Sequence, residues 1–194
     1  MNIDCQHYLD LVEKEHLLAA WDTESQGLVG DYGRLYVVSV KPFGKATITL
    51  TISENGQDKR LAKDARDLLH EYPCWVTFYG KGHDVPLLNT RLTRWGYSPL
   101  ETRHHVDAYY LVKHRLKTGH RSQAHMLEFL GDTMAMLGIP RARKMTVSPN
   151  VWSELFPNYH KNIRFLRDRC ESDAEGLESL YRVTRHLIRD IARG

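Results

Sequence analysis

The apolar run at residues 17–20 is followed at once by Trp21 and by two acids, Asp22 and Glu24, two positions apart. Such a run is typical of a buried β-strand, and side chains alternate between the two faces of a strand. We therefore expect the Asp22 and Glu24 carboxylates to point to the same face near the end of a strand. Two carboxylates placed in this way can bind one divalent cation, because hard cations prefer oxygen ligands.

The spacing of apolar residues changes along the first half of the chain. Between residues 46 and 52, apolar side chains alternate with three threonines, which is the pattern of a strand with one buried and one polar face. From Asp58 the apolar residues recur at helical spacing until Pro73, which restricts its predecessor and ends the helix. Applied along the chain, these rules predict strands at 17–24, 35–40, 46–52, 74–79 and 105–107. They predict helices at 1–16, 58–72, 84–95, 108–117, 122–137, 149–156 and 160–191.

This order of elements predicts an α/β domain with a mixed sheet of about five strands flanked by helices and a helical C-terminal half. A length of 194 residues and an apolar content of 42% suit a single domain at 1–194 with a substantial core. In such sheets, sites form where strands end and loops diverge. We therefore look for functional residues at or just past the predicted strand ends.

The cysteines and the N-terminus predict a cytoplasmic protein that does not enter a membrane. Three cysteines lie far apart, without metal-site spacing and without the even number of a disulfide framework. The N-terminal residues have neither the basic start nor the apolar core of a signal peptide, and no window has the apolar length of a membrane span. The net charge of +3 is only mildly favourable for a polyanionic partner.

Two further acids are candidates to complete a metal site. Asp84 follows the fourth predicted strand and lies two residues before Pro86, where it can bind a ligand or cap the next helix. Asp173 falls in the inward-facing stripe of the last predicted helix, where an unpaired carboxylate would be costly and a bound metal would compensate it. Alternatively, residues 172–175 match a capping box, which would restart a helix and leave Asp173 exposed.

Three segments in order resemble the motifs of the DEDD exonucleases of the ribonuclease H-like fold, also called DnaQ-like. Asp22-Thr23-Glu24 resembles the first motif, residues 79–88 with Asp84 resemble the second, and residues 169–181 with Asp173 resemble the third. The chain is most similar to predicted ribonuclease H-like nucleases related to the exonuclease domains of family B DNA polymerases. Further matching segments are the Asp-x-Pro-x-Leu at 84–88, the Arg-rich 89–94 and the His-x-Asp-x-Tyr at 105–109.

The resemblance implies a metal-dependent 3′–5′ exonuclease that hydrolyses single-stranded nucleic acid, with DNA somewhat favoured over RNA. It implies that Asp22, Glu24, Asp84 and Asp173 are the catalytic ligands of two Mg²⁺ or Mn²⁺ ions, with Asp22 bridging both ions and Asp84 acting mostly through water. Two ions of this kind activate a water molecule and stabilise the leaving oxygen of a phosphodiester. Endonucleolytic cutting of structured substrates is a further possibility.

The chain departs from the family at the residue that orients the attacking water. The family carries a tyrosine four residues before the last aspartate or a histidine five residues before it, and these positions are Arg169 and Asp168 here. The residues considered as a substitute or as an accessory group are His83, Asp107, Tyr159, His160 and Arg169, although each also has a structural interpretation. The departure favours a rival hypothesis, a catalytically weakened ribonuclease H-like module that binds nucleic acid or a protein partner.

Basic residues near these segments are candidates to contact a nucleic acid, because they can neutralise phosphates while aromatic neighbours stack on unpaired bases. The alternative is that long basic side chains are ordinary helix surface. The candidates are Arg91, Arg94, Arg103, Lys113 and Arg115. Several histidines follow in the same region, but without the spacing of a zinc site. A phosphate-binding Gly-x-x-x-x-Gly-Lys loop and a Gly-x-Ser-x-Gly elbow are both missing from the sequence.

Overall fold

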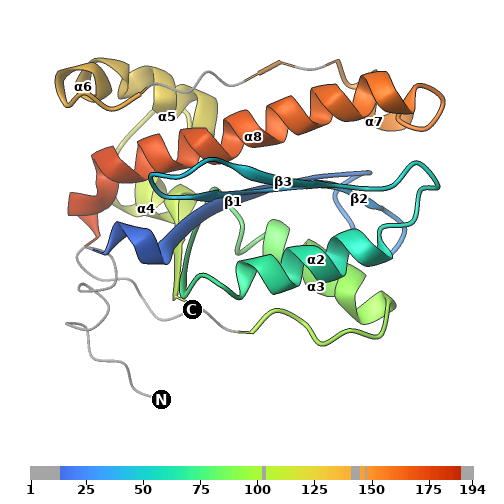
Figure 1. Ribbon diagram of the computed structural model, residues 1–194. Coiled ribbons are helices and arrows are strands. Elements are labelled where there is room, and N and C mark those ends of the chain that lie inside the picture. The colour runs from blue at the N-terminus through green and yellow to red at the C-terminus, as the bar shows by residue number, and fades with distance from the viewer. Residues whose placement is uncertain (1–13, 102–103, 141–144, 147, 189–194) are drawn as a thin grey trace.

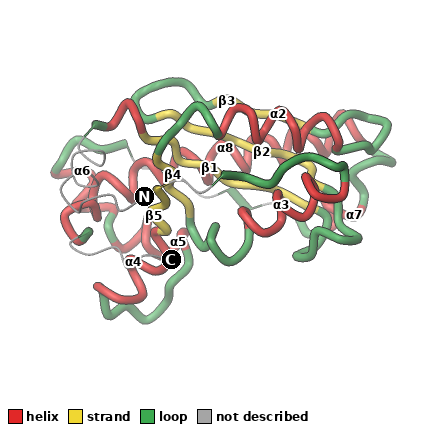
Figure 2. The backbone as a smooth tube through the Cα atoms, turned by 90° about the horizontal axis from the view of Figure 1, so that it is seen from below, coloured by secondary structure: helices red, strands yellow, loops and turns green. Residues whose placement is uncertain are grey.

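The computed structural model describes residues 14–101, 104–140, 145–146 and 148–188, which form one mixed five-stranded sheet with helices on both faces (Figure 1). The strand order across the sheet is β3-β2-β1-β4-β5, which can be followed in Figure 2. The strands are β1 (Leu18–Ser25), β2 (Leu35–Pro42), β3 (Ile48–Thr51), β4 (Cys74–Thr77) and β5 (His104–Asp107). The predicted α/β architecture is therefore confirmed.

The central strand β1 has an antiparallel neighbour on one side and a parallel neighbour on the other. It pairs antiparallel with β2, where Asp22 lies opposite Ser39, and parallel with β4, where Ala20 lies beside Val76. β5 runs parallel to β4. The carboxyl ends of β1, β4 and β5 consequently meet along one edge of the sheet, where α/β proteins place their sites.

Helices cover both faces of this sheet. α8 (Tyr159–Thr184) crosses one face, above the sheet in Figure 1, whereas α2 (Lys59–Leu69) and α3 (Asp84–Arg94) lie below it. The other helices are α4 (Ala108–Arg115), α5 (Gln123–Phe129), α6 (Gly131–Met136) and α7 (Asn150–Ser153). Short 3₁₀ turns, Glu15–Leu17 and Arg185–Leu187, precede β1 and follow α8.

The alternation of side chains along β1 divides the core in two. Trp21 packs in a cluster with Leu61 of α2 and Leu88 of α3, whereas Ala20 packs in a cluster with Leu177 of α8. Because side chains two residues apart share a face, Asp22 and Glu24 continue the face that α8 covers. The sheet thus directs both acids toward the C-terminal helix.

The element boundaries differ from the prediction at a few points. The fourth strand ends at Thr77 and not at Tyr79, because Tyr79 has a φ of 65°, which strand residues do not adopt. The helix expected at 122–137 is broken at Leu130, next to Gly131, a residue that weakens helices. Of the helix expected at 1–16, residues 1–13 lie outside the described residues, and the last helix is continuous only to Thr184.

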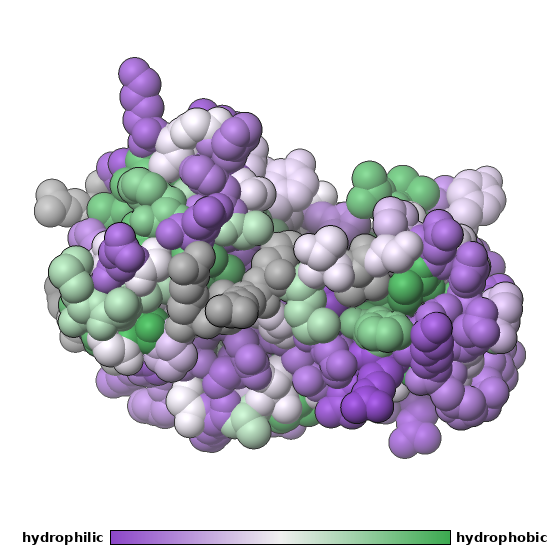
Figure 3. Space-filling model, turned by 90° about the horizontal axis from the view of Figure 1, so that it is seen from above, coloured by the Kyte–Doolittle hydropathy of each residue, from purple (hydrophilic) through white to green (hydrophobic). Residues whose placement is uncertain are grey.

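Figure 3 shows the face of the molecule that carries α8. Apolar side chains gather at the end formed by α5 and α6, where Phe129, Met136 and Leu137 are exposed. Every helix within the described residues is too short or too polar to span a bilayer.

Candidate metal centre

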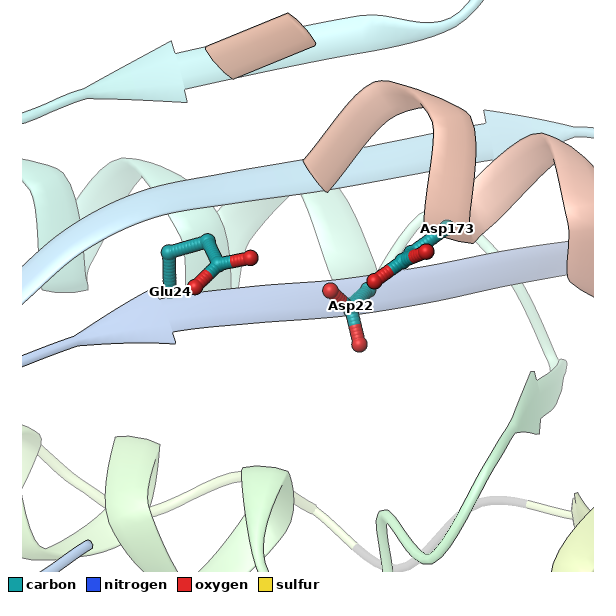
Figure 4. A group of neighbouring side chains, drawn as sticks. All are labelled: Asp22, Glu24 and Asp173. Atoms are coloured by element: carbon teal, nitrogen blue, oxygen red, sulfur yellow. The ribbon is translucent and has the colours of Figure 1, made fainter. Parts of the chain in front are cut away.

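Three carboxylates from two elements converge between β1 and α8. Asp22, Glu24 and Asp173 each contribute one oxygen, and these oxygens lie within 4.8 Å of one another. Figure 4 shows the Asp22 and Glu24 side chains on β1 and the Asp173 side chain reaching down from α8 toward Asp22. The structure therefore brings together three of the four acids predicted as metal ligands.

The position of Asp173 follows from the inward stripe of α8. This helix runs without a break through Ser172, so the alternative in which a helix restarts there is wrong, and Asp173 is only 3% exposed. Nearly one turn earlier, the fully buried Cys170 thiol donates to the backbone carbonyl of Asp22, with Sγ 3.3 Å from the oxygen. Cys170 thereby holds α8 against β1 at the level of the acids.

Both carboxylate oxygens of Glu24 accept hydrogen bonds. Arg169 Nε donates to Oε1 at 2.7 Å, and Trp152 Nε1 donates to Oε2 at 2.9 Å. The guanidinium carbon of Arg169 also lies 5.3 Å from the centre of the Trp152 ring. Burial raises the pKa of Glu24, although Arg169 and Trp152 both act to lower it. No sequence pattern marked Trp152, because it reaches Glu24 only through the packing of α7 on the rest of the fold.

Arg169 occupies the position at which the resembled family carries a tyrosine. Its Nη2 lies 4.0 Å from Asp173 Oδ2, and its Nη1 donates to the Met145 carbonyl at 3.1 Å. Burial alone would lower the pKa of Arg169, but Glu24 and Asp173 outweigh burial and raise this pKa. The side chain is therefore a permanent cation that donates hydrogen bonds and cannot accept a proton from water.

The four charged groups fit a divalent cation. Asp22, Glu24, Asp173 and Arg169 together carry a formal charge of −2, which one divalent ion would balance. Carboxylate oxygens are the donors that Mg²⁺ and Mn²⁺ prefer, and buried charges are stabilised by a partner of opposite sign. Asp22, Glu24 and Asp173 are thus the residues that would hold such an ion.

Asp84 lies near this group but outside it. It is the first residue of α3, it is 3% exposed, and its Oδ1 accepts a hydrogen bond from the Thr23 hydroxyl at 2.6 Å. Thr23 lies between Asp22 and Glu24 on β1, so alternation turns its side chain to the opposite face. Burial raises the pKa of Asp84, while Thr23 and the preceding residue, His83, lower it. The N-cap position belongs to His83, so Asp84 is not the helix cap.

Asp107 uses its carboxylate to hold backbone. Its Oδ1 accepts from the amides of Tyr79 at 2.7 Å and Tyr109 at 3.1 Å, and its Oδ2 accepts from the amide of Lys81 at 3.0 Å. Burial raises the pKa of Asp107, and these three amides lower it. Asp107 therefore caps α4 and fixes the loop that leads to Asp84.

Tyr159 and His160 are far from the carboxylates along α8. They begin this helix, and Asp173 follows about 20 Å further along its axis, at 1.5 Å per residue. The Tyr159 hydroxyl donates to the Ile52 carbonyl, and His160 Nε2 lies 3.7 Å from Glu54 Oε1. The structure therefore gives both residues contacts with the segment that follows β3, outside the group of three carboxylates.

Arg91, predicted to contact nucleic acid, is corrected to a buried structural residue. Its Nε donates to Asp58 Oδ2 at 2.7 Å and its Nη2 to Asp58 Oδ1 at 2.8 Å, and Arg91 is 3% exposed. A third donor, Nη1, bonds to the Gly30 carbonyl at 2.9 Å. The helical spacing did not reveal this role, because the partner acid lies on a different element.

The other predicted nucleic-acid contacts divide between two surfaces. Arg94 is exposed near the end of α3, where its Nη1 donates to the Asp31 carbonyl at 3.1 Å. Lys113 and Arg115 are exposed on α4. Arg103 lies outside the described residues. Lys113 and Arg115 thus stand on the helix that directly follows β5, whereas Arg94 lies at the far end of α3.

Comparisons with known proteins give one family and several similar folds. The model of the RNase H superfamily matches residues 20–181. The chain is similar to a family B DNA polymerase from the hyperthermophilic archaeon Pyrobaculum calidifontis, with a TM-score of 0.62 and 16% identity over 85% of this chain and 24% of the polymerase. It thus spans about a quarter of the polymerase. No curated protein matches the sequence.

Two smaller solved structures are also similar. One is the apo form of a nuclease, with a TM-score of 0.55 and 20% identity over 97% of this chain and 79% of that one. The other is NrnC of Brucella melitensis, with a TM-score of 0.54 and 16% identity over 88% of this chain and 73% of that one. At these identities the structural similarities establish the fold.

Proposed function

The chain belongs to the RNase H superfamily, and we propose that it is a metal-dependent 3′–5′ exonuclease that hydrolyses single-stranded nucleic acid, with DNA somewhat favoured over RNA. The observation that carries this proposal is the convergence of Asp22, Glu24 and Asp173 at the carboxyl end of the central strand. The fold that the chain shares with a DNA polymerase and with two nucleases supports it.

The roles proposed for the acids are those that the resemblance to the DEDD exonucleases implies. Asp22, Glu24 and Asp173 would hold one Mg²⁺ or Mn²⁺ ion. Asp22 would also hold a second ion, which Asp84 would contact mostly through water. The two ions would supply an activated water and neutralise the leaving oxygen. β1 presents two of these carboxylates and α8 the third, so both elements must keep their register. The short hydrogen bond from Thr23 keeps the Asp84 carboxylate turned toward β1.

Arg169 would act by positioning. Five residues were considered for orienting the water, and Arg169 is the one of them that contacts the three converging carboxylates. Its guanidinium lies 2.7 Å from Glu24 and 4.0 Å from Asp173. A guanidinium can orient an oxygen by donating to it, but it cannot take up the proton of an attacking water. Arg169 therefore fixes Glu24 and balances charge, and proton transfer is left to carboxylates or bulk water.

An assay with end-labelled single-stranded DNA and RNA tests the proposal. With Mg²⁺ or Mn²⁺ we expect a ladder that shortens from the 3′ end, no products in EDTA, and loss of activity in Asp22→Asn. Asp64→Asn, which removes an exposed acid of α2, is the matched control and should retain activity. Degradation that persists in EDTA or in Asp22→Asn would contradict the proposal, and internal fragments in place of a ladder would indicate an endonuclease.

One observation favours a second candidate function, a weakened module that binds nucleic acid or a protein partner. The position of the expected tyrosine is held by Arg169, whose ion pair with Glu24 occupies a proposed metal ligand. Under this alternative, metal ions and nucleic acid bind without cleavage. Binding of labelled oligonucleotide, measured beside the cleavage assay on one preparation, separates the two functions.

A further inference from the structure

Tyr79 combines two features that packing alone does not require. Its φ of 65° lies in the left-handed region, and it is the only non-glycine residue with a positive φ among the described residues. Its side chain is also 45% exposed, although aromatic rings are stabilised by burial. Strained backbone of this kind persists where the surrounding structure enforces it, and it clusters at binding sites.

The Tyr79 ring belongs to a fixed group of aromatic side chains, which we call the tyrosine platform: Tyr79, Tyr109, Tyr110 and His114. The ring centres of Tyr79 and Tyr109 are 5.1 Å apart, those of Tyr109 and Tyr110 are 5.3 Å apart, and Tyr110 and His114 stack at 6.4 Å. A Cβ atom at Gly82 would come within 2.6 Å of the Tyr79 ring, so this ring rests on the glycine backbone. The rings are therefore ordered before any ligand arrives, which lowers the entropy lost on binding.

Positive charge accompanies the platform. Residues 108–127 contain no acidic side chain. This stretch carries four exposed basic residues, Lys113, Arg115, Lys117 and Arg121. Lys113 Nζ lies 5.9 Å from the centre of the Tyr110 ring. Aromatic rings interleaved with exposed cations suit a ligand that has flat rings and a negative backbone, which describes an unpaired nucleic-acid strand.

The platform lies beside the metal centre along the edge of the sheet. β4 runs parallel to β1 with Val76 beside Ala20, so the chain after Thr77 emerges one strand spacing, about 5 Å, from the segment that holds Asp22. Figure 2 shows α4 next to β5 at this side of the sheet. The platform and the carboxylates therefore lie at the same edge of the sheet.

We propose that the tyrosine platform binds the unpaired bases of the single-stranded substrate, with Lys113 and Arg115 contacting its phosphates; this inference rests on the proposed function and specifies where the substrate lies. Tyr79 and Tyr110 stack on successive bases, and stacking is indifferent to base identity because every base has a flat face. A duplex keeps its bases stacked inside and cannot make these contacts. The platform thus selects single strands over duplexes.

Substituting Tyr79 by glycine gives a sharp test, because glycine adopts a φ of 65° without strain. Binding of a fluorescein-labelled oligothymidylate to the full chain is measured by anisotropy in EDTA, which prevents hydrolysis. We expect Tyr79→Gly to weaken binding about tenfold or more, while its urea midpoint stays equal to or above that of the wild type. Tyr79→Phe should bind like the wild type, and so should Tyr32→Ala, which removes a tyrosine that is 89% exposed on another loop.

The charge contribution is read from salt dependence. Lys113→Gln should lower the slope of log K against log salt concentration by about one, whereas Arg60→Gln on α2 should leave the slope unchanged. The inference would be overturned if Tyr79→Gly bound the oligothymidylate as tightly as the wild type does. It would also be overturned if the wild type bound single strands and blunt duplexes with equal affinity. If cleavage of single strands survives in that case, only the platform is refuted. If the wild type neither binds nor cleaves single strands, the proposed function is refuted with it.

Discussion

Removing the positive charge of Arg169 should increase the affinity of the centre for divalent cations. Arg169 Nε donates to Glu24 Oε1 at 2.7 Å, and the two side chains are only 22% and 9% exposed. A cation that uses this oxygen must first displace the guanidinium. Hydrogen bonds to charged groups contribute about 1.5–3 kcal/mol net, and 1.4 kcal/mol corresponds to a factor of about ten in affinity. We therefore expect Arg169→Gln to bind Mn²⁺ about 10- to 100-fold more tightly than the wild type.

Titration calorimetry with Mn²⁺ in the absence of nucleic acid measures this affinity directly. Trp152 provides a second readout, because its indole N–H donates to the other oxygen of Glu24 at 2.9 Å, and its fluorescence should change when a cation binds. The matched control is Arg167→Gln, which removes an equal charge from the same helix where Arg167 pairs with Glu171 at 2.8 Å. Unchanged or weaker Mn²⁺ binding in Arg169→Gln would refute the competition between guanidinium and metal.

Three further predictions concern stability. Asp58→Asn should lower the free energy of unfolding by about 3–5 kcal/mol in urea titrations, because it leaves the buried Arg91 without its charged partner. Burial alone would raise the pKa of Asp58, but hydrogen bonds from Arg91, the Leu35 amide and Trp95 outweigh it and lower this pKa. The stability that this shift provides is complete above the pKa of Asp58 in the unfolded chain and is lost as the pH falls below about 4. Below that pH, the urea midpoint of the wild type should therefore fall more steeply than that of Asp58→Asn. Asp22→Asn should raise the melting temperature in EDTA by relieving repulsion among the acids, and it should lose the increase that Mn²⁺ gives the wild type.

The sequence predicted those parts of the site that depend on local periodicity. Alternation placed Asp22 and Glu24 on one strand face. The helical stripe offered an inward position for Asp173, but only the unbroken course of α8 decides against the capping-box alternative. Trp152 and the pairing of Arg91 were not recoverable, because each depends on a partner brought close only by tertiary packing. Helical spacing alone cannot tell whether a basic residue lies on the surface, contacts the substrate or forms a buried ion pair. The deciding fact is the position of an acid elsewhere in the fold, as Asp58 shows for Arg91.

The left-handed backbone of Tyr79 also escaped prediction, since Gly80 and Gly82, which follow it, offered easier positions for the turn. The strain is enforced by Asp107, which binds the amides of Tyr79 and Lys81 on the loop and caps α4 with the same carboxylate. The ion pair of Asp58 and Arg91 fixes the far end of α3 in a comparable way. In both places a buried acid holds backbone or helix at a defined position.

These fixed connections explain how the proposed substrate surface and the carboxylates can keep one geometry. Asp107 anchors the loop after β4, this loop leads into Asp84, and Asp84 bonds to Thr23, which lies between the two acids of β1. Hydrogen bonds and the backbone between Lys81 and Asp84 therefore join the tyrosine platform to the strand that carries the proposed metal ligands. Hydrolysis of a bound strand requires its phosphate to be placed within a fraction of an ångström of the catalytic groups. A rigid path supplies that placement, whereas a platform on a free loop would not.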